Sequence, residues 1–79
     1  MTDIDSRLTR CFLSVFPKLP QTAAATATSE TMDSWDSIAA ATLLTIVSEE
    51  FEIPIDYEAV DQLTSFAAIR EYVAAQLAS

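Results

Sequence analysis

Glycine and histidine are both absent from this chain of 79 residues, and cysteine occurs once, at Cys11. Without glycine, we expect neither tight hairpin turns nor a glycine-rich loop that binds phosphate. Without histidine and with a single thiol, the chain lacks a histidine-based catalytic dyad, a zinc cage and an internal disulfide. No base, metal cage or cofactor loop is visible, so we expect that the chain is not an enzyme and holds no metal.

Long hydrophobic runs and basic residues are also scarce. The apolar runs fall well short of the roughly 20 residues that cross a bilayer, and the N-terminus lacks the charge and apolar core of a signal peptide. The formal net charge is −8, with nine carboxylates and no basic residue from Glu30 to Asp61. Such a surface repels nucleic acids and anionic membranes and attracts basic partners, although acidity also keeps a small chain soluble. We expect one cytoplasmic, monomeric domain over residues 1–79, without nucleic-acid binding or membrane insertion.

Apolar residues recur at helical spacing in three stretches, and no strand-like alternation is visible. The first stretch can be capped by Thr2 or Asp3 and ends near Pro17. Its apolar stripe consists of Ile4, Leu8, Phe12 and Val15. Cys11 falls on the same face, which indicates a buried and inert thiol. The segment from Gln21 to Thr31 has no such stripe, and we expect a long ordered connection with room for a short helical turn.

The second helical stretch begins at Ser37. Asp36 is a good N-cap, because its carboxylate can accept from the free amides of the first turn and its charge suits the positive end of the helix dipole. The helix should end by about Glu52, since Pro54 favours an extended residue before it. Ser37 then lies at the exposed N-terminus of the helix. The apolar stripe of this helix consists of Leu43, Leu44, Val47 and Phe51.

Two further helices complete the expected all-α fold, which has three main helices, one short helix and a long loop between the first two. Asp56 caps the short helix over Tyr57–Leu63, and Thr64 or Ser65 caps the last one. The stripe of the last helix consists of Phe66, Ile69, Val73 and Leu77. From the second helix onward, the predicted core consists of Leu43, Leu44, Ile46, Val47, Phe51, Ile53, Ile55, Val60, Leu63, Phe66 and Ile69.

The segment Asp36-Ser37-Ile38, with the apolar run that ends in Glu49-Glu50-Phe51, resembles the phosphopantetheine attachment segment of acyl carrier proteins. The resemblance continues through Glu52-Ile53-Pro54-Ile55 and Thr64-Ser65-Phe66 to the C-terminus, and it covers about four fifths of the chain. It implies one acyl carrier domain over residues 1–79, folded as an acyl-carrier-like four-helix bundle. It also implies that a phosphopantetheinyl transferase attaches 4'-phosphopantetheine from coenzyme A to Ser37, with Asp36 as part of the motif.

The resemblance further implies partners and a role. A carrier of this family holds acyl groups as thioesters and presents them to acyl-loading and acyl-processing enzymes, here of a specialised fatty-acid, polyketide or related pathway. The chemistry at Ser37 must come from a partner, because a nucleophilic serine needs a neighbouring base that this chain lacks. Without the family pattern, Ser37 is simply a good residue for a helix start.

Departures from the family pattern point to the partner surface. Ser34-Trp35 stands where glycine is usual, and Ile38 replaces leucine. The exposed face of the second helix carries no acid before Glu49, which predicts a more apolar docking surface. We therefore expect partner recognition by Trp35, Ile38, Ala39, Thr42 and Thr45. Trp35, with Met32, can instead anchor the long connection to the core, which is the commoner use of a large aromatic.

Two alternatives remain open from the sequence. One is an aminoacyl or peptidyl carrier protein of nonribosomal peptide-type synthesis, although such carriers more often have glycines before the serine and a less acidic surface. The other is a helical protein-interaction domain that keeps the fold without the prosthetic arm.

Overall fold

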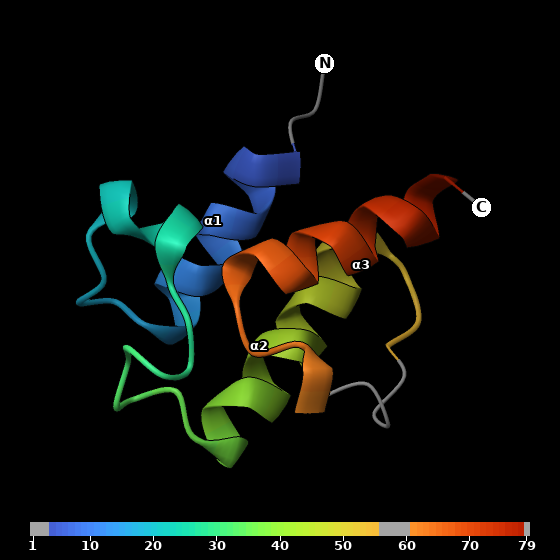
Figure 1. Cartoon of the computed structure of the whole chain (residues 1–79). Coiled ribbons are helices and arrows are strands. Elements are labelled where there is room, and N and C mark those ends of the chain that lie inside the picture. Colours follow the sequence, from blue (N-terminus) through green and yellow to red (C-terminus); the bar gives the residue numbers. More distant parts are fainter. Residues whose placement is uncertain (1–3, 56–60, 79) are drawn as a thin grey trace.

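The computed structural model describes residues 4–55 and 61–78, and this part of the chain is mostly helical (Figure 1). Its elements are α1 (Ile4–Val15), the 3-10 helix η1 (Gln21–Thr26), α2 (Ser37–Phe51) and α3 (Phe66–Ala78). Apart from one isolated β-bridge, the described residues contain no strand pairing. The expected all-α class is confirmed. The short helix predicted over Tyr57–Leu63 lies mostly outside the described residues, as do its cap Asp56 and the core residue Val60.

None of the helices in the described ranges combines the length and the apolar character that crossing a bilayer requires.

Helix α1 follows its apolar pattern closely. Leu8 and Phe12 have no exposed surface, and Cys11 is buried beside them, as predicted. The helix ends at Val15, two residues before Pro17, which has no amide hydrogen to continue the helical pattern. The predicted caps of this helix, Thr2 and Asp3, lie outside the described residues.

The ring of Phe12 joins three parts of the chain. Its centroid lies 5.4 Å from that of Trp35 in an edge-to-face arrangement, 6.2 Å from that of Phe16 and 5.1 Å from that of Phe66. Trp35 directly precedes the cap of α2, Phe16 directly follows α1, and Phe66 begins α3. Each such aromatic pair contributes about 0.5–1.5 kcal/mol beyond the burial of its area.

The connection between α1 and α2 is ordered and contains a short helical turn, as predicted. η1 occupies its first half, and Ala24 and Ala27 are both buried, because small side chains let this segment lie close to α1 and α3. Thr28 then forms an antiparallel bridge with Ser65. The amide of Phe66 donates to the carbonyl of Ala27 at 3.0 Å on one side of this bridge. The middle of the connection is therefore bound to the start of α3.

Helix α2 ends at a left-handed residue. Glu52 has φ 53° and ψ 46°, the only non-glycine residue with positive φ among those described. The amide of Ile53 reaches back to the carbonyl of Ser48 at 3.1 Å, which closes the last turn as in a Schellman motif. Ile53 is buried, in agreement with its predicted inward direction. The predicted end near Glu52 is confirmed, and the backbone conformation of Glu52 supplies the stop.

Helix α3 begins where Ser65 caps it, since the amide of Ala68 donates to the Ser65 hydroxyl at 3.1 Å. Phe66, Ile69 and Val73 are buried as predicted. Leu77 is 47% exposed, so its assignment to the buried stripe is wrong. Figure 1 shows the reason, because the last turn of α3 extends beyond the end of the bundle, where no other described element covers it.

One arginine holds the C-terminal end of α2 against α1. Arg7 donates through Nε to a carboxylate oxygen of Glu50 at 2.7 Å and also donates to the Glu50 carbonyl. Its guanidinium carbon lies 4.5 Å from the ring centre of Phe51. The cationic side chain of Arg7 also suits the negative end of the α2 dipole.

A second ion pair joins Arg70 of α3 to Asp5 of α1. Because both ion pairs are partly exposed, each contributes about 0–1 kcal/mol to stability.

The left-handed end of α2 can be tested with two substitutions at Glu52. We expect Glu52→Gly to be more stable to denaturant than Glu52→Ala by about 1 kcal/mol, because only glycine adopts this conformation without steric cost from a Cβ atom. Both variants lose the same carboxylate, so the difference between them reports on the backbone. Equal midpoints of urea unfolding for the two variants would contradict the assigned conformation.

Candidate functional site

The start of α2 is organised by Asp36. Its backbone is extended, with φ −96° and ψ −173°, and one carboxylate oxygen accepts from the amide of Ala39 at 2.8 Å. The carbonyl of Asp36 accepts from the amide of Ala40 at 2.8 Å, which begins the helical bond pattern. The predicted N-cap is confirmed. Ser37 is consequently the first helical residue.

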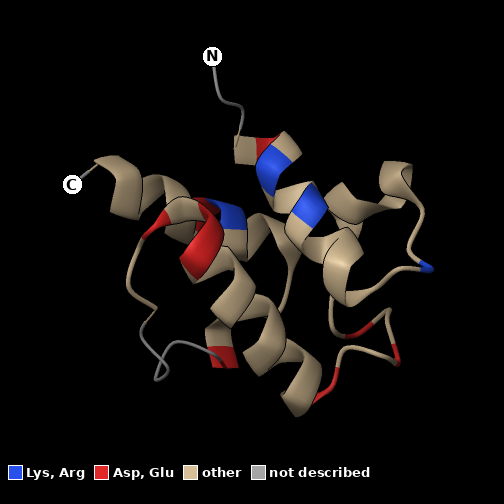
Figure 2. Cartoon of the chain, turned by 180° about the vertical axis from the view of Figure 1, so that it is seen from behind, with Lys and Arg blue, Asp and Glu red and all other residues tan. Residues whose placement is uncertain are grey.

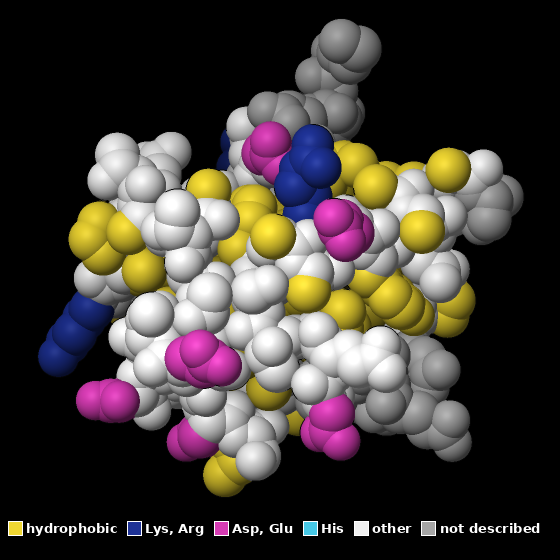
Figure 3. Space-filling view, viewed as in Figure 1, with side chains coloured by type: hydrophobic (Ala, Val, Ile, Leu, Met, Phe, Trp, Pro, Cys, Tyr) yellow, Lys and Arg dark blue, Asp and Glu magenta, His cyan; other side chains and the backbone are white. Residues whose placement is uncertain are grey.

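The Ser37 side chain is available to a partner. Ser37 is exposed, and its hydroxyl forms no hydrogen bond with any described residue. It lies at the positive end of the α2 dipole, where helix amides lack intrahelical partners and an anion is favoured. In Figure 1 this end of α2 is at the bottom of the molecule, and Figure 3 shows several Asp and Glu side chains on that lower part. The serine therefore lies on an open and acidic surface.

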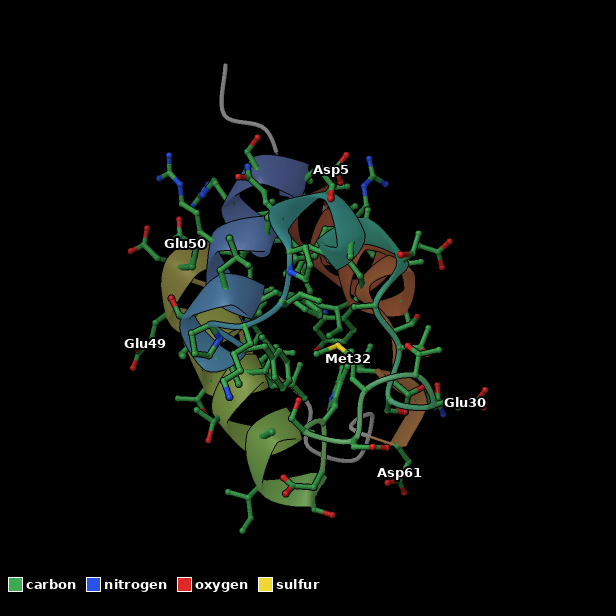
Figure 4. All side chains as sticks on the ribbon, turned by 90° about the vertical axis from the view of Figure 1, so that its left-hand side faces the viewer. Asp5, Glu30, Met32, Glu49, Glu50 and Asp61 are labelled. Carbon is green, nitrogen blue, oxygen red and sulfur yellow. The ribbon has the colours of Figure 1, made fainter. Side chains whose placement is uncertain are left out.

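A groove of about 400 Å³ runs beside Ser37. Its lining combines apolar surface from Trp35, Ala40 and Leu63 with the carboxylates of Asp36 and Asp61. Ser29 and Thr64 add two hydroxyl groups. In Figure 4 Asp61 lies low in the molecule, as does the start of α2, whereas Glu49 and Glu50 lie higher and on the other side.

Part of this groove has no signal in the sequence. No sequence pattern associates Ser29, Asp61 or Thr64 with Ser37, and Leu63 is predicted only as a core residue. These residues meet because the amide of Ser29 donates to the carbonyl of Thr64 at 2.8 Å, beside the bridge to Ser65. Such a pairing between distant segments leaves no periodic signal in the sequence.

Trp35 lies in the core. The residue is only 6% exposed, and its ring packs against those of Phe12 and Phe16, with a centroid distance of 5.7 Å to Phe16. Its assignment to the partner surface is therefore corrected, because so little of the residue remains accessible. The role as an anchor of the connection agrees with its burial. Met32, the other predicted anchor, is partly buried against the same core.

The outer face of α2 carries the other predicted partner residues. Ile38 is 78% exposed, Thr42 and Thr45 are exposed, and Ala39 is partly buried beside them. The hydroxyl of Thr42 donates to the carbonyl of Ile38 at 3.0 Å, and that of Thr45 donates to the carbonyl of Ala41 at 2.9 Å. Both hydroxyl hydrogens are thus used within the helix.

This outer face is also free of charge. No ionisable residue lies between Asp36 and Glu49 in the sequence, and in Figure 2 the helix is uncoloured between its acidic ends. Ile38, Thr42 and Thr45 recur at helical spacing, so they form one exposed strip of methyl groups and hydroxyl oxygens. That this strip meets a partner remains a prediction.

Two further features of the described residues concern metal binding and the single thiol. Within residues 4–55 and 61–78, no cluster of three or more His, Cys, Asp or Glu side chains can hold a metal ion. Burial raises the pKa of the Cys11 thiol to about 11, and the nearby Glu50 carboxylate adds to this rise. The thiol is therefore protonated near neutral pH and is a poor nucleophile.

A scan of protein-family models and searches of curated proteins and of solved structures each returned no match to this chain.

The capping role of Asp36 is testable by stability. We expect Asp36→Ala to lower the free energy of unfolding by about 1 kcal/mol, because the amide of Ala39 loses its acceptor, whereas Asp36→Asn should retain most of the stability. Asp33→Ala, an exposed carboxylate in the same connection, serves as the control and should change stability little. Urea unfolding followed by circular dichroism measures all three, and a loss in Asp36→Asn as large as in Asp36→Ala would argue against the cap.

The environment of Cys11 predicts slow alkylation. In native protein near neutral pH we expect iodoacetamide to modify Cys11 far more slowly than in urea, because the reactive thiolate is disfavoured and covered. Mass spectrometry of timed samples measures the labelling, and equal rates of alkylation in the native and the urea-unfolded protein would refute the buried thiol.

The raised pKa of Cys11 also implies that stability falls as the pH rises above about 9, the ordinary value of a thiol. Above that pH the unfolded state releases a proton that the folded state retains.

Proposed function

We propose that this chain is an acyl carrier protein in which Ser37 carries a 4'-phosphopantetheine arm. One observation carries the proposal: an exposed serine occupies the first position of a capped helix, directly after Asp36 and beside a groove. The resemblance of the segment around Ser37 to the carrier attachment site supplies the chemical identity of the arm. The small all-α architecture is compatible with an acyl-carrier-like bundle.

The residues around Ser37 fit such a group. The hydroxyl faces solvent, and a phosphodiester at the first position of α2 benefits from the helix dipole. Asp36 lies next to it and repels an anion, so the phosphate is expected to face solvent. Along the groove, Ser29 and Thr64 would bind amide groups of the arm, and Leu63 would contact its methylene groups.

The attachment reaction depends on a second protein. Ser37 has no histidine base anywhere in the chain, and solvated carboxylates are weak bases. A phosphopantetheinyl transferase with its own magnesium would take the hydroxyl proton. The bond from the Ser37 oxygen to phosphorus forms as the pyrophosphate bond of coenzyme A breaks, and the adenosine bisphosphate half leaves. The attached arm supplies a thiol for acyl thioesters, a role for which the buried Cys11 is unsuited.

The outer face of α2 supports a distinct set of partner enzymes. The strip formed by Ile38, Thr42 and Thr45 begins one residue after Ser37 and carries no charge. Acyl-loading and acyl-processing enzymes that bind there would use apolar contacts along the strip and basic groups only near its acidic ends. Such binding depends less on salt concentration than docking through rows of carboxylates. This favours a specialised pathway.

One observation favours a second candidate, an aminoacyl or peptidyl carrier. Asp36 and Asp61 both line the groove beside Ser37. Two carboxylates at this place suit a cargo with an ammonium group better than a simple fatty-acyl chain. Comparing how acyl-activating and aminoacyl-activating enzymes load the modified protein would separate the two candidates.

The proposal predicts modification of Ser37. Purified protein incubated with coenzyme A, magnesium and a broad-specificity phosphopantetheinyl transferase should gain the mass of one phosphopantetheine. Ser37→Ala should gain none, and Ser34→Ala, a nearby exposed serine, should be modified like the original chain. Intact-mass spectrometry measures all three.

Two outcomes would count against the carrier. A folded chain that gains no mass with several transferases would favour the interaction domain without an arm. Equal modification of Ser37→Ala would assign the arm to another residue and remove the role of Ser37.

A further inference from the structure

A second hollow, of about 420 Å³, lies at the end of α1 and is separate from Ser37. Its lining includes Val15, Phe16, Pro17, Lys18, Leu19 and Met32. Figure 3 shows hydrophobic side chains gathered over the segment after α1, at the left of the view, and Figure 4 shows Met32 turned toward the interior of the molecule. The volume is within the range of small-molecule sites.

Both walls of this hollow are held by hydrogen-bonded turns. The amide of Leu19 donates to the carbonyl of Phe16 at 3.0 Å, and the amide of Trp35 donates to the carbonyl of Met32 at 3.0 Å. Pro17 restricts the backbone further. A ligand would therefore find the walls already formed, which lowers the entropy lost on binding.

The single charged residue of the lining is a cation. Lys18 is exposed and forms no ion pair with a described residue, whereas Arg7 and Arg70 both do. The whole chain has a net charge of −8, so most of its surface repels anions. This hollow combines apolar walls with a local positive charge and has no carboxylate in its lining.

We propose that this hollow binds a small amphipathic anion, namely a medium-length alkyl chain that ends in a carboxylate. The chain lies against Phe16, Leu19 and Met32, where methionine adapts to varied shapes, and the carboxylate lies near Lys18. The inference goes beyond the carrier function and does not depend on the arm at Ser37.

The rings of Phe12, Phe16, Trp35 and Phe66 form an aromatic cluster, and this aromatic cluster provides a reporter of binding. Phe16 lines the hollow and lies 5.7 Å from Trp35, measured between ring centroids, and Trp35 is the only tryptophan of the chain. Occupation of the hollow should therefore change the fluorescence of Trp35 through Phe16.

We would titrate the full chain with decanoate and, separately, with decyltrimethylammonium, both below the concentrations at which they form micelles. Trp35 fluorescence and two-dimensional NMR of the backbone amides would follow binding. The two probes have alkyl chains of similar length and differ in the charge and size of the head group. We expect saturable shifts with decanoate that centre on residues 15–20 and on Met32 and Ser34, and weaker binding of the cation.

Variants test the two parts of the site. Leu19→Gln should weaken decanoate binding roughly tenfold, a change that corresponds to the loss of one buried apolar contact. Leu13→Gln is the matched control and should bind decanoate normally. Leu13 is also a partly buried leucine, but it belongs to α1 and lies outside the lining. Lys18→Gln, an exposed substitution that leaves the fold intact, should abolish the preference for decanoate over the cation.

Several results would overturn the proposal. These are the absence of saturable shifts, shifts spread over the molecule or centred on the groove beside Ser37, binding of the cation as strong as that of decanoate, and equal weakening by Leu13→Gln. Ser37→Ala should bind decanoate like the original chain, so the result is independent of whether Ser37 carries an arm.

Discussion

The packing of Phe12 against Trp35 is the contact on which the candidate site depends. Phe12 belongs to α1 and has no exposed surface, while Trp35 immediately precedes the cap of α2. Their edge-to-face contact therefore determines where Asp36 and Ser37 lie relative to the bundle. Phe66 packs on the same Phe12 ring, so the start of α3 is held to the same point. This packing, together with the pairing of Ser29 with Thr64, gives the serine at the helix start a defined environment.

Helix α2 has one face buried in the bundle and an opposite face exposed to solvent. Leu43, Leu44 and Val47 are buried and hold the helix in the bundle. The opposite face carries the exposed Ile38 and threonines whose hydroxyls donate to carbonyls of their own helix. The ends of the helix are closed without glycine, by the Asp36 side chain at the start and by the left-handed Glu52 at the end. The face between these ends is uncharged, so its interactions are governed by shape and apolar area.

Two hollows border the aromatic cluster, and their chemistry differs. Trp35 lines the groove at Ser37, which contains two carboxylates, whereas Phe16 lines the apolar hollow at the end of α1, which contains one lysine. The two rings are in contact. In a chain with a net charge of −8, the lining of one hollow is thus locally basic and that of the other is acidic. The contacting rings of Phe16 and Trp35 therefore lie between the two hollows.

The sequence by itself determined the features that depend on neighbouring residues. The C-terminal ends of α1 and α2, the cap at Asp36 and the exposed place of Ser37 follow from helical periodicity, proline positions and capping chemistry within a few residues. Only the tertiary structure decided the burial of Trp35, the exposure of Leu77 and the pairing of Ser29 with Thr64. These depend on contacts between residues far apart in the chain, and such contacts arise from packing and leave no local pattern. The groove beside Ser37 exists for that reason, because it forms only when the connection is bound to the start of α3.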